Sequence, residues 1–234
     1  MLILAIDTST AAASVAVADE KKLYGEMFTD LKLKHSEKLM LMTDALLKNL
    51  RMNISDIDAF AFGKGPGSFT GLRIAAAAVK GFAQPENKPV MAVSSLAATA
   101  YMQCVADGFI IAPVFDAQQQ SFYTASFKMK NGSLVRLNED RVEKIDSFAK
   151  CFEGTYEKIV FCGDAAVVHR ETLGKMFEGR SLFAKPALNY PRASAVAALA
   201  QEMISAGEYD SYADVLPNYI RASQAEVNYK VKVK

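Results

Sequence analysis

The chain opens with short apolar segments that polar turns separate. Strands are predicted over residues 2–6, 14–18 and 22–29, because each is a short run of mainly apolar or alternating residues. Polar residues 7–10 and 19–21 interrupt these runs. Three strands in succession, joined by such short turns, indicate an antiparallel meander at the start of a β-sheet.

Helical spacing follows the meander. Between Ser36 and Arg51 the apolar residues recur every three or four positions, which predicts an amphipathic helix. The next elements are a strand over 59–62, a glycine-rich loop over 63–71, a helix over 72–82, a strand over 89–93 and a helix that begins at Ser94 and Ser95. The order β-β-β-α-β-α-β-α predicts a mixed sheet that helices cover.

The second half of the chain repeats this order of elements in a different sequence. We expect strands over 109–115, 121–129 and 133–137, a helix capped by Asp146, a strand over 158–161, a helix over 165–176, a strand over 181–184 and a helix over 193–206. Asn131 and Gly132 are a strong hairpin signal before residue 133. The repeat predicts two α/β subdomains, residues 1–106 and 107–234. The alternating tail, 227–234, is expected to be a solvated end rather than an edge strand.

Composition then narrows the class of protein. The 234 residues are 51% hydrophobic and 23% charged, which is typical of a folded chain with a sizeable core. The formal net charge is +1, so no overall field draws the chain to a nucleic acid. Three cysteines without paired spacing favour a reducing compartment. The chain starts without a signal-peptide pattern and has no membrane-spanning apolar run, so we expect a cytoplasmic protein without membrane contact.

The glycine-rich loop is the most informative segment. Gly65, Gly67 and Gly71 permit a close approach of backbone, and the free N–H groups at the start of the following helix favour an anion. The loop is not a Walker A motif, because Lys64 precedes the turn. Ser68 is expected to cap the helix rather than to act as a nucleophile. A nucleotide or another anion nevertheless remains a candidate ligand.

The turn over residues 7–10 is a second candidate, since an acidic residue and hydroxyl groups can orient a magnesium-bound phosphate. The candidate nucleotide- or anion-binding residues are Asp7, Thr8, Ser9, Gly65, Gly67, Ser68, Thr70, Gly71 and Arg73. His35 and His169 are expected to be structural, because one or two isolated imidazoles make neither a metal cage nor a catalytic relay. The glutamines at residues 118–120 are expected to have a binding role or to form a turn. Residues 216–221 are expected either to form an interface or to pack as a C-terminal segment.

Several of these segments occur together in a known order. They are residues 6–9 (IDTS), 35–37 (HSE), 65–74 (GPGSFTGLRI), 93–96 (VSSL), 116–117 (DA) and 217–221 (PNYIR). In this order and over nearly its whole length, the chain resembles the TsaB family, also called YeaZ. One departure lies at residues 118–120, where many relatives carry basic residues and this chain carries glutamines.

The resemblance implies an α/β fold of two actin-like subdomains, the architecture of actin-like ATPases, sugar kinases and Hsp70 (ASKHA, RNase H-like), with mixed sheets flanked by helices. It also implies a partner subunit that works with a TsaD-type transferase and a TsaE-type ATPase. Together they form N6-threonylcarbamoyladenosine beside the anticodon of tRNAs that read codons starting with A. ATP and metal are expected on the partners, no cofactor on this chain, and tRNA contact mainly through the complex.

The resemblance also implies that this chain is not the catalyst. TsaD-type subunits hold a metal with a His-x-x-x-His pair, and Ser95 and Thr99 stand at the corresponding positions here. Because neutral hydroxyls are poor metal ligands beside imidazole, the metal site is predicted to be absent, with no catalytic residue. Two alternatives stay open: an ATPase- or GTPase-like switch that uses Asp7 and the 65–71 loop, and, more weakly, a protease.

A partner role requires a surface, and TsaB-like proteins form homodimers or heterodimers through the first subdomain. We expect a homodimer in isolation. The candidate interface residues on the first two helices are Leu39, Met42, Leu46, Ala75, Ala78 and Val79. Small alanines permit close helix packing, and a surface containing methionine can adapt to different partners. The competing interpretation, that these residues only cover their own sheet, carries equal weight.

Overall fold

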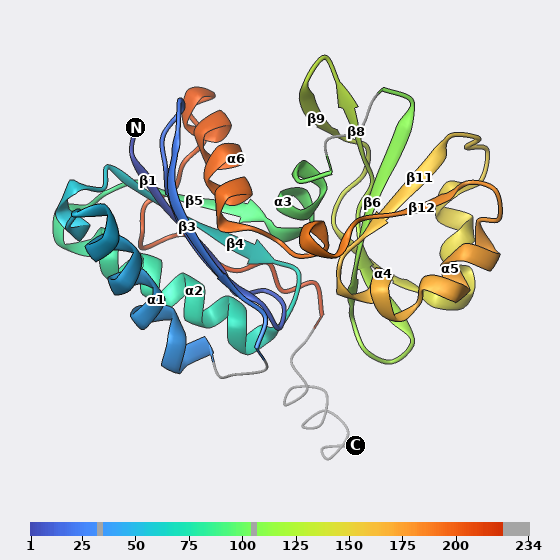
Figure 1. Ribbon diagram of the computed structural model, residues 1–234, viewed down its shortest axis with the longest axis horizontal. Helices are drawn as coiled ribbons and strands as arrows, with labels where there is room; N and C mark the ends of the chain where they lie inside the picture. Colours follow the sequence, from blue (N-terminus) through green and yellow to red (C-terminus); the bar gives the residue numbers. More distant parts are fainter. Residues whose placement is uncertain (32–34, 104–106, 222–234) are drawn as a thin grey trace.

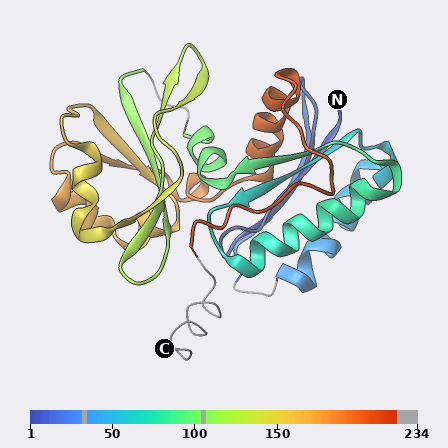
Figure 2. The same cartoon turned by 180° about the vertical axis from the view of Figure 1, so that it is seen from behind.

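Two β-sheets organise the computed structural model, which describes residues 1–31, 35–103 and 107–221 (Figure 1). Each sheet is the centre of one lobe, and the lobes lie side by side with α3 between them (Figures 1 and 2). Because every buried strand needs apolar cover on both faces, helices from distant parts of the sequence pack on each sheet.

The first sheet has the strand order β3-β2-β1-β4-β5. Its strands are β1 (Ile3–Asp7), β2 (Ala13–Ala18), β3 (Leu23–Thr29), β4 (Ala59–Gly65) and β5 (Val90–Ser94). The first three strands pair antiparallel, and β4 and β5 extend the sheet in parallel with β1. The predicted meander and mixed sheet are therefore confirmed.

Alternating residues of β1 supply two separate cores. Leu4 and Ile6 point to the face that α1 (His35–Leu50) and α2 (Phe69–Ala83) cover. Ile3 and Ala5 point to the opposite face, where α6 (Ala193–Ser205) packs. α6 contributes mainly alanines and one valine to this core, and side chains of that size let the helix lie close to the sheet.

The last helix belongs to the second half of the chain in sequence but to the first lobe in space. It contacts β1, β2, β4 and β5, and the segment after it returns to β5 through a bridge between Val90 and Asp210. The division of the chain between residues 106 and 107 stays a prediction. The structure adds that the first lobe is completed by residues from the far end of the chain.

The second sheet has the order β10-β7-β6-β11-β12, and a hairpin of β8 and β9 attaches to β6. The strands are β6 (Phe109–Asp116), β7 (Ser121–Thr124), β8 (Phe127–Lys130), β9 (Ser133–Arg136), β10 (Arg141–Lys144), β11 (Lys158–Cys162) and β12 (Ser181–Phe183). The predicted turn at Asn131 and Gly132 joins β8 to β9. Short α3 (Ser95–Tyr101) packs against β6 and β8 through a shared apolar cluster.

Helical elements complete the second lobe. They are α4 (Asp164–Val168), α5 (Arg170–Met176) and the 3₁₀ segment Ile145–Phe152, and further 3₁₀ turns lie at Ile54–Asp56, Gln84–Glu86 and Pro186–Leu188. Among the residues that the structure describes, no helix is long and apolar enough to cross a membrane.

Four local predictions are wrong. The strand-like run 121–129 is two strands, β7 and β8. In addition, β10 was not predicted, because its sequence is mostly charged and it becomes a strand by pairing with β7. The helix over 165–176 breaks at His169 into α4 and α5. Asp146 does not cap a helix, since Lys144 holds the cap position of a 3₁₀ segment. α2 begins at Phe69, three residues earlier than predicted. The tail 227–234 lies outside the described residues.

A candidate site in the cleft between the lobes

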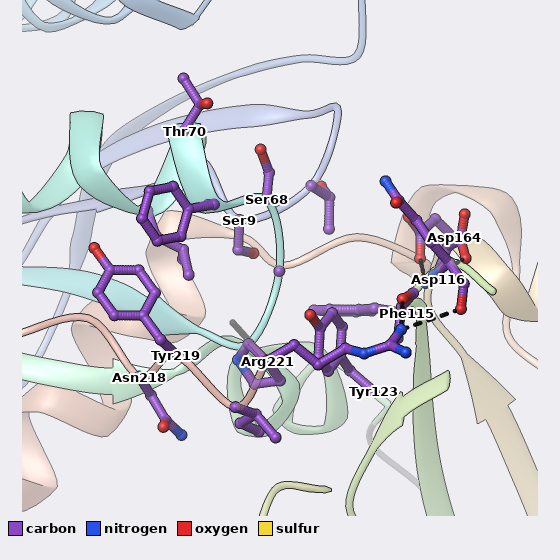
Figure 3. Close-up of a pocket in the computed structure, with 18 of the residues that line it drawn as sticks. Ser9, Ser68, Thr70, Phe115, Asp116, Tyr123, Asp164, Asn218, Tyr219 and Arg221 are labelled. Atoms are coloured by element: carbon purple, nitrogen blue, oxygen red, sulfur yellow. Dashed lines mark hydrogen bonds between the residues drawn. The ribbon is translucent and has the colours of Figure 1, made fainter. Parts of the chain in front are cut away.

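A cleft of about 550 Å³ lies between the lobes (Figure 3). Residues 9–11 and 66–70 line it from the first lobe, and residues 115–119 with Asp164 line it from the second. Residues 218–221 of the C-terminal segment complete the wall. The volume falls in the usual range for small-molecule sites, and the lining is mostly polar.

Two of the predicted glycines hold the glycine-rich loop against the turn that follows β1. A Cβ atom on Gly67 would lie 2.1 Å from the carbonyl oxygen of Ser9, and one on Gly71 would lie 1.9 Å from that of Thr8. The Ser68 N–H donates to the Ser9 carbonyl at 2.7 Å, and the Thr8 hydroxyl donates to the Gly71 carbonyl at 2.8 Å. Packing of backbone on backbone therefore suffices to explain these glycines.

Asp7 is buried behind the cleft and does not line it. The N–H and hydroxyl of Ser9 donate to one carboxylate oxygen at 2.8 and 2.7 Å, and the Ser95 hydroxyl donates to the other at 2.7 Å. Burial raises the pKa of Asp7, and these hydrogen bonds offset only part of the effect. The backbone of Gly63 also packs closely against the Asp7 carboxylate, since a Cβ on Gly63 would lie 1.8 Å from a carboxylate oxygen. No room is therefore left there for a ligand.

Ser95 and Thr99 do not suit a metal ion. Both side chains are fully buried. The Ser95 hydroxyl donates to Asp7, and the Thr99 hydroxyl donates to the backbone carbonyl of Ser95 at 2.8 Å. Neutral hydroxyls with their protons already engaged are poor ligands. Within residues 1–31, 35–103 and 107–221, no group of three or more His, Cys, Asp or Glu side chains could hold a metal ion.

The first turn of α2 faces the cleft, as the predicted anion nest requires. The Ser68 hydroxyl accepts a hydrogen bond from the Gly71 N–H at 3.3 Å, so its role as the N-cap is confirmed. Phe69 and Thr70 also line the cleft. Arg73 does not line the cleft; it is exposed on α2, where its guanidinium group lies 5.5 Å from the centre of the Phe69 ring.

The candidate residues therefore divide into groups. Those that line the cleft are Ser9, Gly67, Ser68 and Thr70, whereas those that lie behind it as support are Asp7, Thr8, Gly65 and Gly71. Arg73 lies on the outer surface of α2. The structure thus brings the two predicted segments together, but it turns the acidic side chain away from the space that a ligand would occupy.

The second lobe contributes two carboxylates that the sequence did not single out as chemistry. Asp164 accepts hydrogen bonds from the N–H groups of Ala165 and Asp116, at 2.8 and 3.2 Å. Burial raises the pKa of Asp164, and the nearby charge of Asp116 adds to this. In the sequence, the signal for Asp164 is the glycine that precedes it directly after the apolar strand β11. In the structure, this Gly163 allows close packing, because a Cβ there would collide with the Val114 carbonyl.

The two histidines have structural contacts, although His35 also lies at the cleft. Nε2 of His35 is 2.9 Å from the Thr10 carbonyl oxygen, where α1 begins. The His169 ring packs edge-on against Phe122 with 5.3 Å between ring centres. Neither contact joins an imidazole to a hydroxyl or thiol nucleophile.

The predicted partner-binding residues on the first two helices are mostly core residues, which corrects their assignment. Leu39, Met42, Leu46, Ala75 and Val79 are all at most 7% exposed, and Ala78 is half-buried. They fill the core between α1, α2 and the first sheet. The apolar side chains that α1 does expose are their neighbours Met40 and Leu41, at 51% and 68%.

Comparisons with known proteins agree with this architecture. Residues 24–229 match the family described as TsaD, tRNA N6-adenosine threonylcarbamoyltransferase. The chain is 30% identical over 229 residues to the tRNA threonylcarbamoyladenosine biosynthesis protein TsaB of Bacillus subtilis, and the match covers 98% of each chain.

Solved structures give the same result. One is a crystal structure from Pseudomonas aeruginosa described as an uncharacterized protein with similarity to peptidase YEAZ. It is 29% identical, with a TM-score of 0.81 over 94% of this chain and 99% of that one. The (R)-2-hydroxyglutaryl-CoA dehydratase component A of Acidaminococcus fermentans shares the fold alone, at 12% identity and a TM-score of 0.54 over 88% of this chain and 99% of that one. The expected two-lobed ASKHA fold is confirmed, and the chain belongs to the TsaB (YeaZ) proteins within the broader TsaD family.

Proposed function

We propose that this chain is a non-catalytic partner subunit in the cytoplasmic synthesis of N6-threonylcarbamoyladenosine in tRNA. In this proposal it binds a TsaD-type transferase, which works with a TsaE-type ATPase and carries the metal and the chemistry. TsaB-named relatives support the pathway. The net charge of only +1 is consistent with a subunit that leaves most of the tRNA contact to its partners.

The observation that carries the non-catalytic role is the environment of Ser95 and Thr99. Both hydroxyls occupy positions where TsaD-type subunits are expected to place metal-binding imidazoles. Both are buried, and both donate hydrogen bonds to groups of this chain. The Ser95 hydroxyl is held by Asp7, which binds the end of β1 to the start of α3. This position therefore serves the fold of the first lobe rather than a catalytic metal.

The surface proposed for the partner is the outer face of α1 and α2. Met40 and Leu41 are exposed on α1, and Ala77 and Gly81 are exposed on α2, beside half-buried Ala78. The two helices lie next to each other on one face of the first sheet (Figure 1). Large apolar side chains beside small ones favour close helix packing, so the same face suits a second copy of this chain or the related transferase.

The alternative function is a nucleotide-dependent switch in the cleft. The cleft volume and the N-terminus of α2 favour it, whereas the enclosed position of Asp7 weighs against it. Calorimetric titration of the isolated chain with Mg-nucleotide distinguishes the two functions. Tight binding with turnover would support the switch, and the partner-subunit proposal expects neither.

The partner-subunit proposal is tested by co-purification with a metal-loaded TsaD-type subunit. A modification assay on tRNA then follows, with and without this chain. We expect a stable complex and modification that requires this chain. A complex that does not form, or modification that proceeds equally well without the chain, would refute the proposal.

A further inference from the structure

The C-terminal segment of the described chain crosses from one lobe to the other. Residues 214–221, which we name the strap, start on the first lobe and end at the loop that follows β6 in the second (Figure 2). The backbone path through this segment joins the lobes at the cleft, where residues 218–221 form part of the wall.

The strap is firmly attached to the first lobe. Val215 is buried in the core beneath α1 and α2. The Asn218 N–H donates to the Lys64 carbonyl at 2.7 Å, at the end of β4. The Tyr219 ring packs on Phe69, with 4.7 Å between ring centres, so the strap also contacts the first turn of α2.

Arg221 makes the contact with the second lobe. Its guanidinium group donates to the backbone carbonyls of Ala117 and Gln118 and, at 2.9 Å, to the side-chain oxygen of Gln119 (Figure 3). These acceptors belong to one loop, and residues 118–120 all have positive φ, between 50° and 58°. Three consecutive non-glycine residues in this conformation are unfavourable, so an external contact helps to keep the loop in place.

The two sides of the lobe interface have different chemistry. Around α3, Leu96 and Ala100 pack against Phe115 and Phe127 in an apolar cluster, and one polar contact is added where the hydroxyl of Ser94 donates to Asp140 at 2.7 Å. At the cleft, the strap connects the lobes through the polar contacts of Arg221. Apolar packing tolerates a small pivot, whereas a guanidinium fork needs a fixed geometry. Opening of the cleft would therefore break the Arg221 contacts, which lie at the cleft itself.

From these contacts we propose that the strap is a lock that holds the two lobes together across the cleft, and that Arg221 is its releasable contact. The lock also connects the cleft with α2 through Tyr219 and Phe69. This inference does not depend on the proposed function in tRNA modification, because it concerns the geometry of the isolated chain.

Hydrogen–deuterium exchange of the whole chain tests the lock. In Arg221→Ala we expect the amides of residues 117–121 to exchange roughly five-fold faster or more, the factor that corresponds to loss of one net hydrogen bond. Arg221→Lys should lie between the two, since a lysine cannot reproduce the fork. Exposed Lys175 on α5 provides the control variant Lys175→Ala, which should match the unaltered chain.

A distance measurement provides the second test. Spin labels at Lys21→Cys and Val168→Cys, in a chain without its native cysteines, report on the separation of the lobes. The lock predicts a wider distance distribution after Arg221→Ala, with unchanged exchange in β1 and β11 as evidence of intact lobes. An unchanged distribution, or unchanged exchange at residues 117–121, would overturn the proposal.

Discussion

Two glycines of α2, Gly71 in its first turn and Gly81 near its end, have different surroundings. Gly71 lets the backbone of α2 touch the backbone at Thr8, where a Cβ would lie 1.9 Å from the carbonyl oxygen. Gly81 meets nothing within 4 Å and is exposed. Within the isolated chain, the same residue type thus permits a close contact at one position and lowers helix stability at the other.

This difference predicts opposite effects of one substitution. Gly71→Ala should lower the free energy of unfolding by about 1–3 kcal/mol, because the new methyl group forces the two backbones apart. Gly81→Ala should raise it by about 0.5–1 kcal/mol, since alanine is the better helix former. Urea titration of both variants measures the two values. Equal effects would mean that the contact between Gly71 and Thr8 is not tight.

Asp7 predicts a dependence of stability on pH. Burial raises its pKa in the folded chain above the ordinary value of 3.8, so the folded chain holds this proton more tightly than the unfolded chain does. As the pH rises above 3.8, the aspartate therefore lowers the free energy of unfolding progressively, and the loss becomes constant once the pH exceeds its folded pKa. The free energy of unfolding of Asp7→Asn, relative to the unaltered chain, should rise between pH 4 and pH 7.

Asp19 supplies a control of opposite sign. Hydrogen bonds from the Lys21 N–H, the Tyr24 hydroxyl and the Lys22 N–H lower its pKa, so it favours the folded state above its unfolded pKa. Asp19→Asn should lose stability relative to the unaltered chain as the pH rises. Parallel slopes for the two variants would contradict the account of Asp7.

At the scale of elements, periodicity located α1, while burial decided which of its residues remain available. Apolar residues at Leu39, Met42 and Leu46 correctly predicted a helix, but this stripe faces the chain's own sheet. The residues that we propose to contact a partner are Met40 and Leu41, which are exposed and fall outside the stripe. An apolar side chain on the polar side of an amphipathic helix is the better sequence signal for an interface.

The exposed leucine predicts a specific effect on association. Leu41→Asp should weaken the homodimer and the complex with a TsaD-type subunit at least about ten-fold, because a charge would be buried in an apolar contact. Val168→Asp on α4 is the matched control, since Val168 is 78% exposed on the other lobe. Sedimentation velocity over a concentration series gives the dissociation constants. Equal weakening by both variants would place the interface elsewhere.

Elements that local patterns define were predictable, whereas those that depend on distant pairing were not. The meander and the hairpin at Asn131 and Gly132 have local signals. β10 has none, because Arg141–Lys144 becomes a strand only by pairing with β7. In the site, the glycine loop and the turn after β1 were predictable from residue type. The orientation of Asp7 away from the cleft depends on Ser95, which lies 88 positions later.

At the scale of the whole molecule, the first lobe depends on the end of the chain. α6 fills one face of its sheet, Val215 enters the core on the other face, and the strap continues from there to the second lobe. The hydrogen bond from buried Ser95 to buried Asp7 joins α3 to β1, and the Thr99 hydroxyl donates to the Ser95 carbonyl within α3. In the proposed function, Ser95 and Thr99 serve the chain's own fold at positions where a TsaD-type subunit is expected to bind a metal, and the exposed apolar side chains of α1 are the contact for a partner.

The most direct measurement is the initial rate of threonylcarbamoyladenosine formation in a reconstituted reaction. It contains tRNA, the threonylcarbamoyl donor, a metal-loaded TsaD-type subunit and a TsaE-type ATPase. We predict background formation without this chain, full formation with it, a reduced rate with Leu41→Asp at limiting concentration, and an unchanged rate with Val168→Asp. The same rate with and without the chain would contradict the account.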